Sequence, residues 1–350
     1  MKNGAVVRRI VLGMVIAAPV LADRTSAVAE DFYAGKTVSL IVSGSGGYEG
    51  YARGFAKHMP KYIPGRPNII VQMMPGGSGM RAANYLYNVA PRDGTTFGAT
   101  HGSVLTAPLL APEVAQFDSA RFGWIGNATR DTYLGYVWHT SPVQSMEEAK
   151  NNLFIVGGTS VGGHGIDTAV VAKEIFGFNL KIVAGYRSSD ETKLALERGE
   201  IHGTLANAWS SLMRTDWFEK KVVHIILQHS DEKRPELPDV PQIKDWARND
   251  TERQILNIMN VRGEITRPFM APPDIPADRL EILRNAFEAT MRDPTFLADM
   301  ERQSLEIDRP LTGKELAVVV DRVAKTPPSA SQKLRDVFAR YKDRSSEPGR

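Results

Sequence analysis

Three glycine-rich stretches are the groups of residues best suited to bind an anion. They occupy residues 43–47 (SGSGG), 75–79 (PGGSG) and 157–163 (GGTSVGG), and none of them contains Lys or Arg. A glycine loop that leads into a helix presents unpaired backbone N–H groups and the positive end of the helix dipole, which favour a carboxylate or a phosphate. Recognition would then rest on backbone amides and on the hydroxyl groups of Ser43, Ser45, Ser78, Thr159 and Ser160. Taken singly, each loop is also explained as a tight turn.

Two of the loops also invite comparison with enzyme motifs. The glycines of the first loop are spaced one residue too widely for a dinucleotide-binding fingerprint, and no acidic residue ends the next apolar run. Residues 158–162 match G-x-S-x-G, with Ser160 as a candidate nucleophile and His101 upstream as an oxyanion element. An α/β-hydrolase needs an acid and then a histidine later in the chain, but the last histidine is His229. A secreted serine esterase that uses Ser160 therefore stays the weaker alternative.

Other reactive residue types point away from metal and thiol chemistry. The seven histidines show no metal-ligand spacing, and the absence of cysteine excludes disulfides and zinc-thiolate sites, so we expect no metal and no cofactor. His58 continues a helical apolar face and is expected to pack there. His101 and His164 stand beside expected loops and could line a pocket.

The elements that must position these residues alternate along the chain. Each glycine loop follows a short apolar run and precedes a helical pattern, which predicts an α/β fold. The C-terminal part is expected to be helical, with Thr312 and Glu315 as a capping box. Strands are expected at residues 38–42, 69–73, 96–99, 124–127, 134–138, 154–156, 181–184, 222–227 and 266–271.

The N-terminus has the pattern of an export signal. Basic residues precede an apolar run at residues 10–18, which is too short for a permanent membrane span, and small residues follow it. We expect cleavage after Ala29, or less favourably after Ala22, and a periplasmic location. Removing residues 1–29 takes away four basic residues and one acidic residue, which accounts for the whole formal charge of +3. The neutral remainder gives no electrostatic reason to expect a nucleic-acid partner.

Short motifs spread over nearly the whole mature chain carry a family resemblance. They are residues 46–49 (GGYE), 51–53 (YAR), 75–79 (PGGSG), 83–86 (ANYL), 91–95 (PRDGT), 185–187 (GYR), 197–200 (ERGE), 209–211 (WSS) and 237–241 (LPDVP). As an ordered set, they resemble the periplasmic solute receptors of tripartite tricarboxylate transporters, the Bug receptors.

The resemblance implies an α/β, two-lobe type II periplasmic-binding-protein fold with two crossover strands. Residues 30–133 plus 265–341 would form lobe 1, residues 134–264 lobe 2 and residues 342–350 a polar tail. The implied function is that of a monomeric receptor without catalytic activity. It would bind a di- or tricarboxylate, or a related small organic anion, in the interlobe cleft and deliver it to a membrane permease of one large and one small subunit. A ligand-binding partner of a membrane sensor is a further alternative.

The resemblance also implies a set of ligand-binding residues. They are Ser43, Gly44, Ser45, Gly46, Gly47, Tyr48, Glu49, Gly76, Gly77, Ser78, His101, Thr159, Ser160, Gly162, His164, Tyr186, Arg187 and Asn207. The chain departs from the family pattern in three places, one of which is the second glycine loop, PGGSG at residues 75–79, where the family usually has glycine-alanine-glycine-glycine. Met73 and Met74 stand where the family usually has an asparagine, and Glu49 replaces the commoner aspartate. For Arg187, an exposed position at a strand end is the slightly favoured explanation over pairing with a ligand carboxylate.

Overall fold

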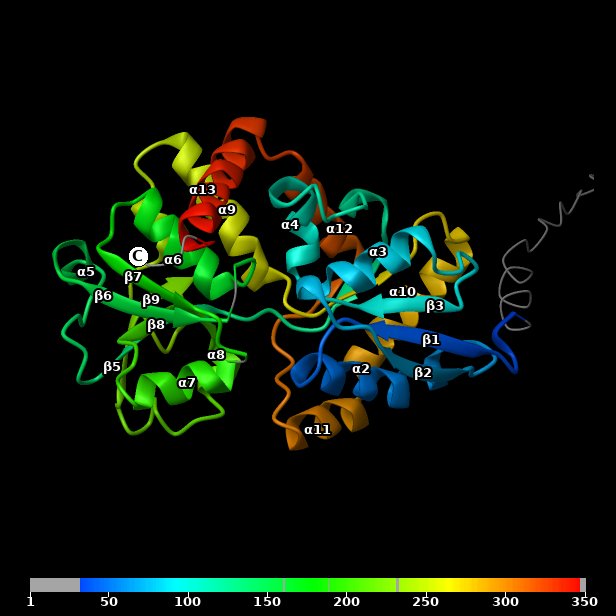
Figure 1. Cartoon of the computed structure of the whole chain (residues 1–350). Coiled ribbons are helices and arrows are strands. Elements are labelled where there is room, and N and C mark those ends of the chain that lie inside the picture. The colour runs from blue at the N-terminus through cyan, green and yellow to red at the C-terminus, as the bar shows by residue number, and fades with distance from the viewer. Residues whose placement is uncertain (1–31, 160, 188, 231–232, 347–350) are drawn as a thin grey trace, which may run out of the picture.

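The computed structural model describes residues 32–159, 161–187, 189–230 and 233–346. The expected signal segment and Ser160 lie outside the described residues. Figure 1 shows two sheets side by side, each with helices on its faces. Within the described ranges, no helix combines the length and the apolarity needed to span a bilayer.

The first sheet has the strand order β11-β4-β10-β3-β1-β2. Strands β1, β2 and β3 are parallel, whereas β10 runs antiparallel to β3 and β4, and β11 antiparallel to β4. Its strands are β1 (Thr37–Val42), β2 (Asn68–Met73), β3 (Thr96–Ala99), β4 (Gly123–Asn127), β10 (Pro268–Ala271) and β11 (Leu311–Thr312). The helices around it are α2 (Gly47–His58), α3 (Met80–Asn88), α4 (Ser103–Leu110), α10 (Ala277–Met291), α11 (Pro294–Arg302) and α12 (Gly313–Ala324).

The second sheet has the order β7-β6-β8-β5-β9. Strand β6 pairs in parallel with β7 and β8, and β5 is antiparallel to β8 and β9. Its strands are β5 (Tyr133–Trp138), β6 (Phe154–Gly158), β7 (Leu180–Ala184), β8 (Gly203–Ala208) and β9 (Val223–His229). Its helices are α5 (Glu148–Asn151), α6 (His164–Glu174), α7 (Ser189–Glu197), α8 (Trp209–Leu212), α9 (Asp250–Glu264) and α13 (Pro328–Ser346). Short 3₁₀ turns are η1 (Met59–Tyr62), η2 (Gly77–Gly79), η3 (Ser119–Arg121) and η4 (Ile243–Trp246).

The sheets have separate cores because each buries its apolar side chains against its own helices. In the first core, Phe55 of α2 packs against Phe269 of β10 and Phe287 of α10. In the second, Phe154 of β6 lies with the apolar faces of α6 and α9. The nine strands expected from the sequence are present within a few residues of their predicted bounds, and β8 and β11 are additional.

The chain passes between the two sheets at three places. Residues 128–132 join β4 to β5, residues 265–267 join α9 to β10, and residues 325–327 join α12 to α13. We keep the division into lobes as a proposal with one change, which concerns α13. Its Ala330 and Leu334 belong to the core of the second sheet, although the sequence placed this segment in lobe 1. The helix also continues to Ser346, into the segment expected as a polar tail.

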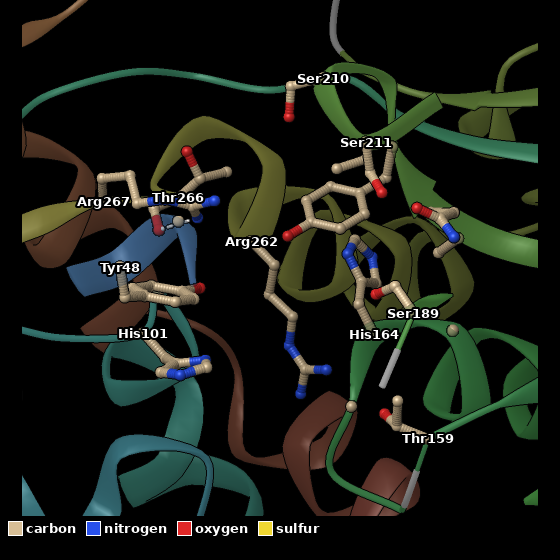
Figure 2. A pocket seen from close by; sticks show the side chains of 18 of the residues that line it. Tyr48, His101, Thr159, His164, Ser189, Ser210, Ser211, Arg262, Thr266 and Arg267 are labelled. Carbon is tan, nitrogen blue, oxygen red and sulfur yellow. Dashed lines mark hydrogen bonds between the residues drawn. The ribbon is translucent and has the colours of Figure 1, made fainter. Parts of the chain in front are cut away.

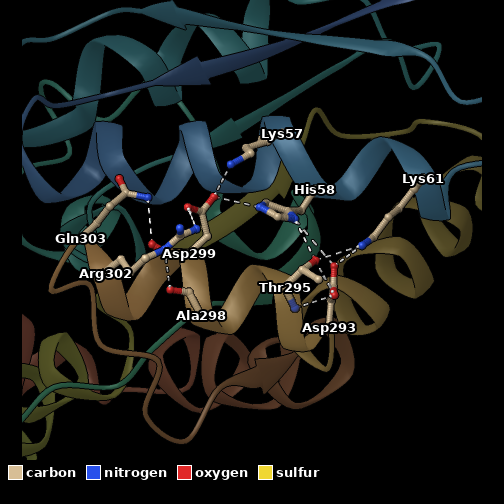
Figure 3. A network of polar contacts seen from close by, with 9 residues as sticks. All are labelled: Lys57, His58, Lys61, Asp293, Thr295, Ala298, Asp299, Arg302 and Gln303. Atoms are coloured by element: carbon tan, nitrogen blue, oxygen red, sulfur yellow. Dashed lines mark hydrogen bonds and ion pairs between the residues drawn. The ribbon is translucent and has the colours of Figure 1, made fainter.

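A network of charged side chains fastens α11 to α2 (Figure 3). His58 lies with its Nε2 2.9 Å from Asp299 Oδ2, and Lys57 Nζ lies 2.7 Å from the same oxygen. Hydrogen bonds from Lys57 and His58 hold the pKa of Asp299 well below its ordinary value. The packed role expected for His58 is confirmed, and the network is structural.

Candidate ligand-binding site

A cavity of about 370 Å³ lies between the two sheets and is lined from both sides (Figure 2). The first sheet contributes the loop after β1, the η2 turn and the segment after β3. The second sheet contributes the loop after β6, the start of α6 and the end of β8. The segment that joins α9 to β10 lines it as well, through Ile265, Thr266 and Arg267. A cavity placed in this way closes or opens when one sheet rotates against the other.

Two helix N-termini reach the cavity without a capping side chain. Helix α2 begins at Gly47 and α6 at His164, both of which line the cavity, and no side chain caps either helix. The local reason is the loop chemistry, since Gly46 has a φ of 65° and Gly162 a φ of 91°, values that favour glycine. Uncapped N–H groups and two positive dipole ends therefore converge on one space, which favours an anion there.

Nine of the eighteen residues predicted from the sequence line this cavity. They are Ser45, Gly47, Tyr48, Ser78, His101, Thr159, Gly162, His164 and Asn207. Ser160 is outside the described residues. The loops after β1 and β6 and the turn before α3 are thus brought together at one place.

The remaining eight predicted residues lie outside the lining, for local reasons. Ser43 is buried, and Gly44 leaves room for a ring, since a Cβ there would lie 3.0 Å from His101 Nε2. Glu49 accepts a hydrogen bond of 2.8 Å from Arg53 on the surface. Gly46, Gly76 and Gly77 support the turns. Tyr186 and Arg187 follow β7, one of the two edge strands of the second sheet, and the Arg187 side chain is 89% exposed and pairs with Glu191.

Charged residues of the lining, among them two arginines beside the crossing between the sheets, were not predicted from the sequence. Arg262, near the end of α9, and Arg267, just before β10, both line the cavity. Figure 2 shows Arg262 between Tyr48 and His101 on one side and His164 on the other. The feature of the sequence that could have identified these two arginines is their position close to residues 265–267, where the chain crosses between the sheets. The other missed lining residues include Tyr51, Tyr133, Ser189, Ser210, Ser211 and Arg214.

Arg267 is a cation without a carboxylate partner. Its guanidinium carbon lies 4.2 Å from the ring centre of Tyr48 and 5.4 Å from that of Tyr51. Its Nη1 donates to the carbonyl oxygen of Thr266 at 2.8 Å, and its Nε is buried without a hydrogen-bond partner. Within the described part of the chain, Arg267 forms no ion pair. Arginine stays protonated in proteins, so a positive charge faces the cavity.

Arg262 is neutralised by a buried carboxylate. Its Nη1 lies 2.7 Å from Asp167 Oδ2, and Asp167 Oδ1 accepts a hydrogen bond of 2.8 Å from Gly162 N. Burial raises the pKa of Asp167, and Arg262 opposes that rise. The pair ties the loop after β6 to α9, whereas Arg262 Nε is buried and has no partner in the described structure.

Two uncharged imidazoles complete the lining. His101 stacks on Tyr48 with ring centres 3.9 Å apart, and burial, aided by Arg267, lowers the pKa of His101 to about 4. His164 lies 4.3 Å from the Tyr133 ring and 5.0 Å from the His229 ring. Burial holds the pKa of His164 well below its ordinary value. Both of its nitrogens are buried without a described partner, so both are available to a bound molecule.

The arrangement is suited to binding an anion. Arg267 supplies a positive charge that no carboxylate contacts directly, while the buried Asp131 interacts with it electrostatically at longer range. The lining also includes an acidic residue, Glu306, whose pKa is raised by burial and by the nearby Asp131 and Asp308. The loops supply N–H and O–H donors, and the neutral imidazoles can donate one hydrogen bond each. Among the described residues, neither His101 nor His164 contacts a carboxylate, so no acid orients a catalytic base there.

Comparison with solved structures places this fold among known proteins. A TctC solute-binding protein from Polaromonas matches with a TM-score of 0.65 and 16% identity over 87% of this chain and 98% of that chain. An adipate-bound protein of R. palustris matches with a TM-score of 0.61 and 18% identity over 87% and 97%. MatC of Rhodopseudomonas palustris, with bound malate, matches with a TM-score of 0.59 and 17% identity over 87% and 99%.

At these identities the likeness establishes the fold, and the two-lobe α/β fold expected from the sequence is confirmed. No protein-family model matches the sequence, and no curated protein is similar to it.

Proposed function

We propose, from the fold that this chain shares with periplasmic solute-binding proteins, that it is an exported receptor for a small organic carboxylate. The ligand would lie in the cavity between the two sheets, and closure around it would present the occupied form to a membrane permease of one large and one small subunit. The resemblance to tripartite tricarboxylate receptors supports this permease type. Two of the structural neighbours hold adipate and malate, which supports the carboxylate class.

The observation that carries the proposal is the unpaired guanidinium of Arg267. A buried cation that no carboxylate contacts directly is costly, even with Asp131 at longer range, and an anion in the space before it lowers that cost. The carboxylate would accept hydrogen bonds from Arg267 and from the N–H groups at the starts of α2 and α6. Charge-assisted bonds of this kind are stronger than neutral ones and fix the orientation of a planar carboxylate.

Binding would be coupled to the angle between the sheets, because the two halves of the site come from different lobes. Tyr48 and His101 belong to the first half, and His164 and Asn207 to the second. A ligand that contacts both halves favours the closed state by its differential affinity for that state. The crossing segments at residues 128–132 and 265–267 would act as the hinge.

The direct test is to identify the molecule that copurifies with the mature chain. Denaturing the purified protein and analysing the released small molecules by mass spectrometry should yield an organic acid in near-stoichiometric amount. Protein refolded from denaturant should then gain thermal stability with that acid, because a ligand that binds only the native state stabilises it by mass action. A panel of carboxylates that gives neither binding nor a shift in Tm would overturn the proposal.

The esterase alternative is tested separately. It predicts hydrolysis of activated esters by the mature chain and loss of that hydrolysis in Ser160→Ala. If the chain is a receptor, neither the mature chain nor its Ser160→Ala variant hydrolyses the esters. A sensory role would appear as ligand-dependent binding to a membrane kinase in place of a permease.

A further inference from the structure

A second, larger cavity adjoins the ligand cavity. It has a volume of about 780 Å³ and lies between α4 of the first sheet and α13 of the second. Four residues line both cavities: Ser78, Ser103, Gly162 and Arg262. The two spaces are therefore neighbours across a shared wall, and we call the second one the side chamber.

The side chamber differs from the ligand cavity in chemistry. Its apolar lining comes from α3, α4 and the residues after it, from the loop before α6, and from α13. The apolar residues are Met80, Ala107, Leu110, Ala111, Val114, Val161, Phe338 and Ala339. Val114 is 46% exposed and Val161 41% exposed. Large apolar side chains exposed together mark a site that something apolar covers.

The shared wall suits a molecule that enters both spaces. The Arg262–Asp167 pair forms part of it, and the hydroxyl of Ser103 donates to the carbonyl oxygen of Ser78 at 2.9 Å. These groups already have an ion-pair or hydrogen-bond partner within the protein. The wall therefore needs no second anion on the side of the side chamber. At Gly162, which lines both spaces, an added Cβ would meet nothing within 4 Å, so there is free space beside this glycine.

Charge also separates the two spaces. Arg267 and Arg214, for which no ion pair is found among the described residues, line the ligand cavity but not the side chamber. In the side chamber, the buried carboxylate of Asp167 is paired with Arg262, and the charged groups of Glu113, Arg335, Lys342 and Asp343 stand with the apolar lining. A ligand with one acidic head group and one apolar body would match this difference between the two cavities.

We propose that the ligand is an amphipathic organic acid, whose carboxylate lies in the ligand cavity and whose apolar body extends past Arg262 into the side chamber. This inference rests on the proposed receptor function and narrows its ligand class. A compact acid with a polar group on every carbon would fill only the ligand cavity. An acid with a hydrocarbon chain or ring would also cover Val114 and Val161.

A homologous series tests the chain-length dependence. Straight-chain monocarboxylates from propionate to decanoate would be titrated into refolded mature protein by calorimetry. Each methylene buried in the side chamber should lower Kd by about fourfold, the equivalent of about 0.8 kcal/mol. The decrease should stop when the chamber is full.

Two substitutions that each place a large side chain in the side chamber, from opposite walls, test whether the ligand enters it. Ala339→Phe, on the exposed face of α13, and Ala111→Phe, at the end of α4, should each weaken binding of the longest acids at least tenfold. Both should leave the affinity for the shortest acids unchanged. Ala324→Phe, at an exposed position of α12 that lines neither cavity, is the control and should change nothing.

The outcomes separate this inference from the proposed function. Binding of short acids with no gain from added methylenes would overturn the side chamber as a ligand subsite and leave the receptor function standing. The same holds if both Phe variants bind long acids like wild type. If no monocarboxylate of the series binds but another carboxylate of the wider panel does, this inference is overturned and the receptor function stands; only the failure of the whole panel contradicts the receptor function.

Discussion

Replacing Arg267 by Met should separate ligand binding from folding. Met keeps an unbranched apolar stem beside the rings of Tyr48 and Tyr51, but it removes the charge that faces the cavity. Truncating one partner of a desolvated charge pair costs about 2–5 kcal/mol of binding free energy, or roughly 30-fold to 4,000-fold in Kd. We therefore expect Arg267→Met to bind the physiological acid at least 30 times more weakly.

The unliganded variant should keep most of its stability. It loses a cation–π contact worth about 0.5–2 kcal/mol and a hydrogen bond to Thr266 worth about 1.5–3 kcal/mol. It also loses the desolvation penalty of an unpaired charge, which is several kcal/mol for a buried ion and less for one at a cavity wall. These effects oppose each other, so the free energy of unfolding should change by no more than about 2 kcal/mol.

Denaturant unfolding with and without ligand measures both quantities. At a ligand concentration 100 times the wild-type Kd, wild type should gain about 2.7 kcal/mol and Arg267→Met about 0.9 kcal/mol or less. Arg187→Met is the control, because Arg187 is exposed and pairs with Glu191 away from the cavity, and it should gain as much as wild type. A variant that still gains the full amount would refute the role assigned to Arg267.

Three further predictions concern stability. Gly102→Ala should destabilise the protein by at least about 3 kcal/mol or prevent folding, since its Cβ would lie 1.7 Å from the carbonyl oxygen of Ile265; normal thermal unfolding of this variant would contradict the packing described. The pKa of His101 is about 4 when folded and 6.5 in an ordinary environment, so the unfolded chain binds the proton first and the free energy of unfolding should fall from pH 6.5 to pH 4. His101→Phe should reduce that slope, and an unchanged slope would argue against a buried neutral imidazole. Burial alone would raise the pKa of Asp293, but hydrogen bonds from Lys61 and Thr295 outweigh it and lower the pKa to about 2. Stability that depends on this carboxylate is thus present above pH 3.8 and lost toward pH 2, and Asp293→Asn should remove that part of the acid transition.

The parts of the site that the sequence predicted are those that depend on local chain chemistry. A glycine loop between a strand and a helix presents unpaired N–H groups wherever it lies in the fold. Ser45, Gly47, Thr159 and Gly162 could therefore be predicted as site residues from the sequence. The short apolar runs predicted nine of the strands, and the resemblance to a receptor family supplied the two-lobe arrangement. Neither depends on the exact packing of side chains.

The parts that were missed depend on tertiary position. Arg267 precedes an apolar strand, and only the crossing between the sheets turns it toward the cavity. Strand β8 (GTLANA) is poor in β-branched residues, and it forms because pairing with β5 and β6 places it inside the sheet. Tyr186 and Arg187 were predicted to contact ligand, but their strand lies at the edge of its sheet.

Calorimetric titration of refolded mature protein with acids and with their matched amides tests the central claim most directly. The amides have nearly the same shape but carry no charge, so they cannot satisfy Arg267. We predict that at least one carboxylate binds with micromolar or lower Kd and that its amide binds at least about 30 times more weakly. Equal affinity for acid and amide, or no binding by any carboxylate, would contradict the account.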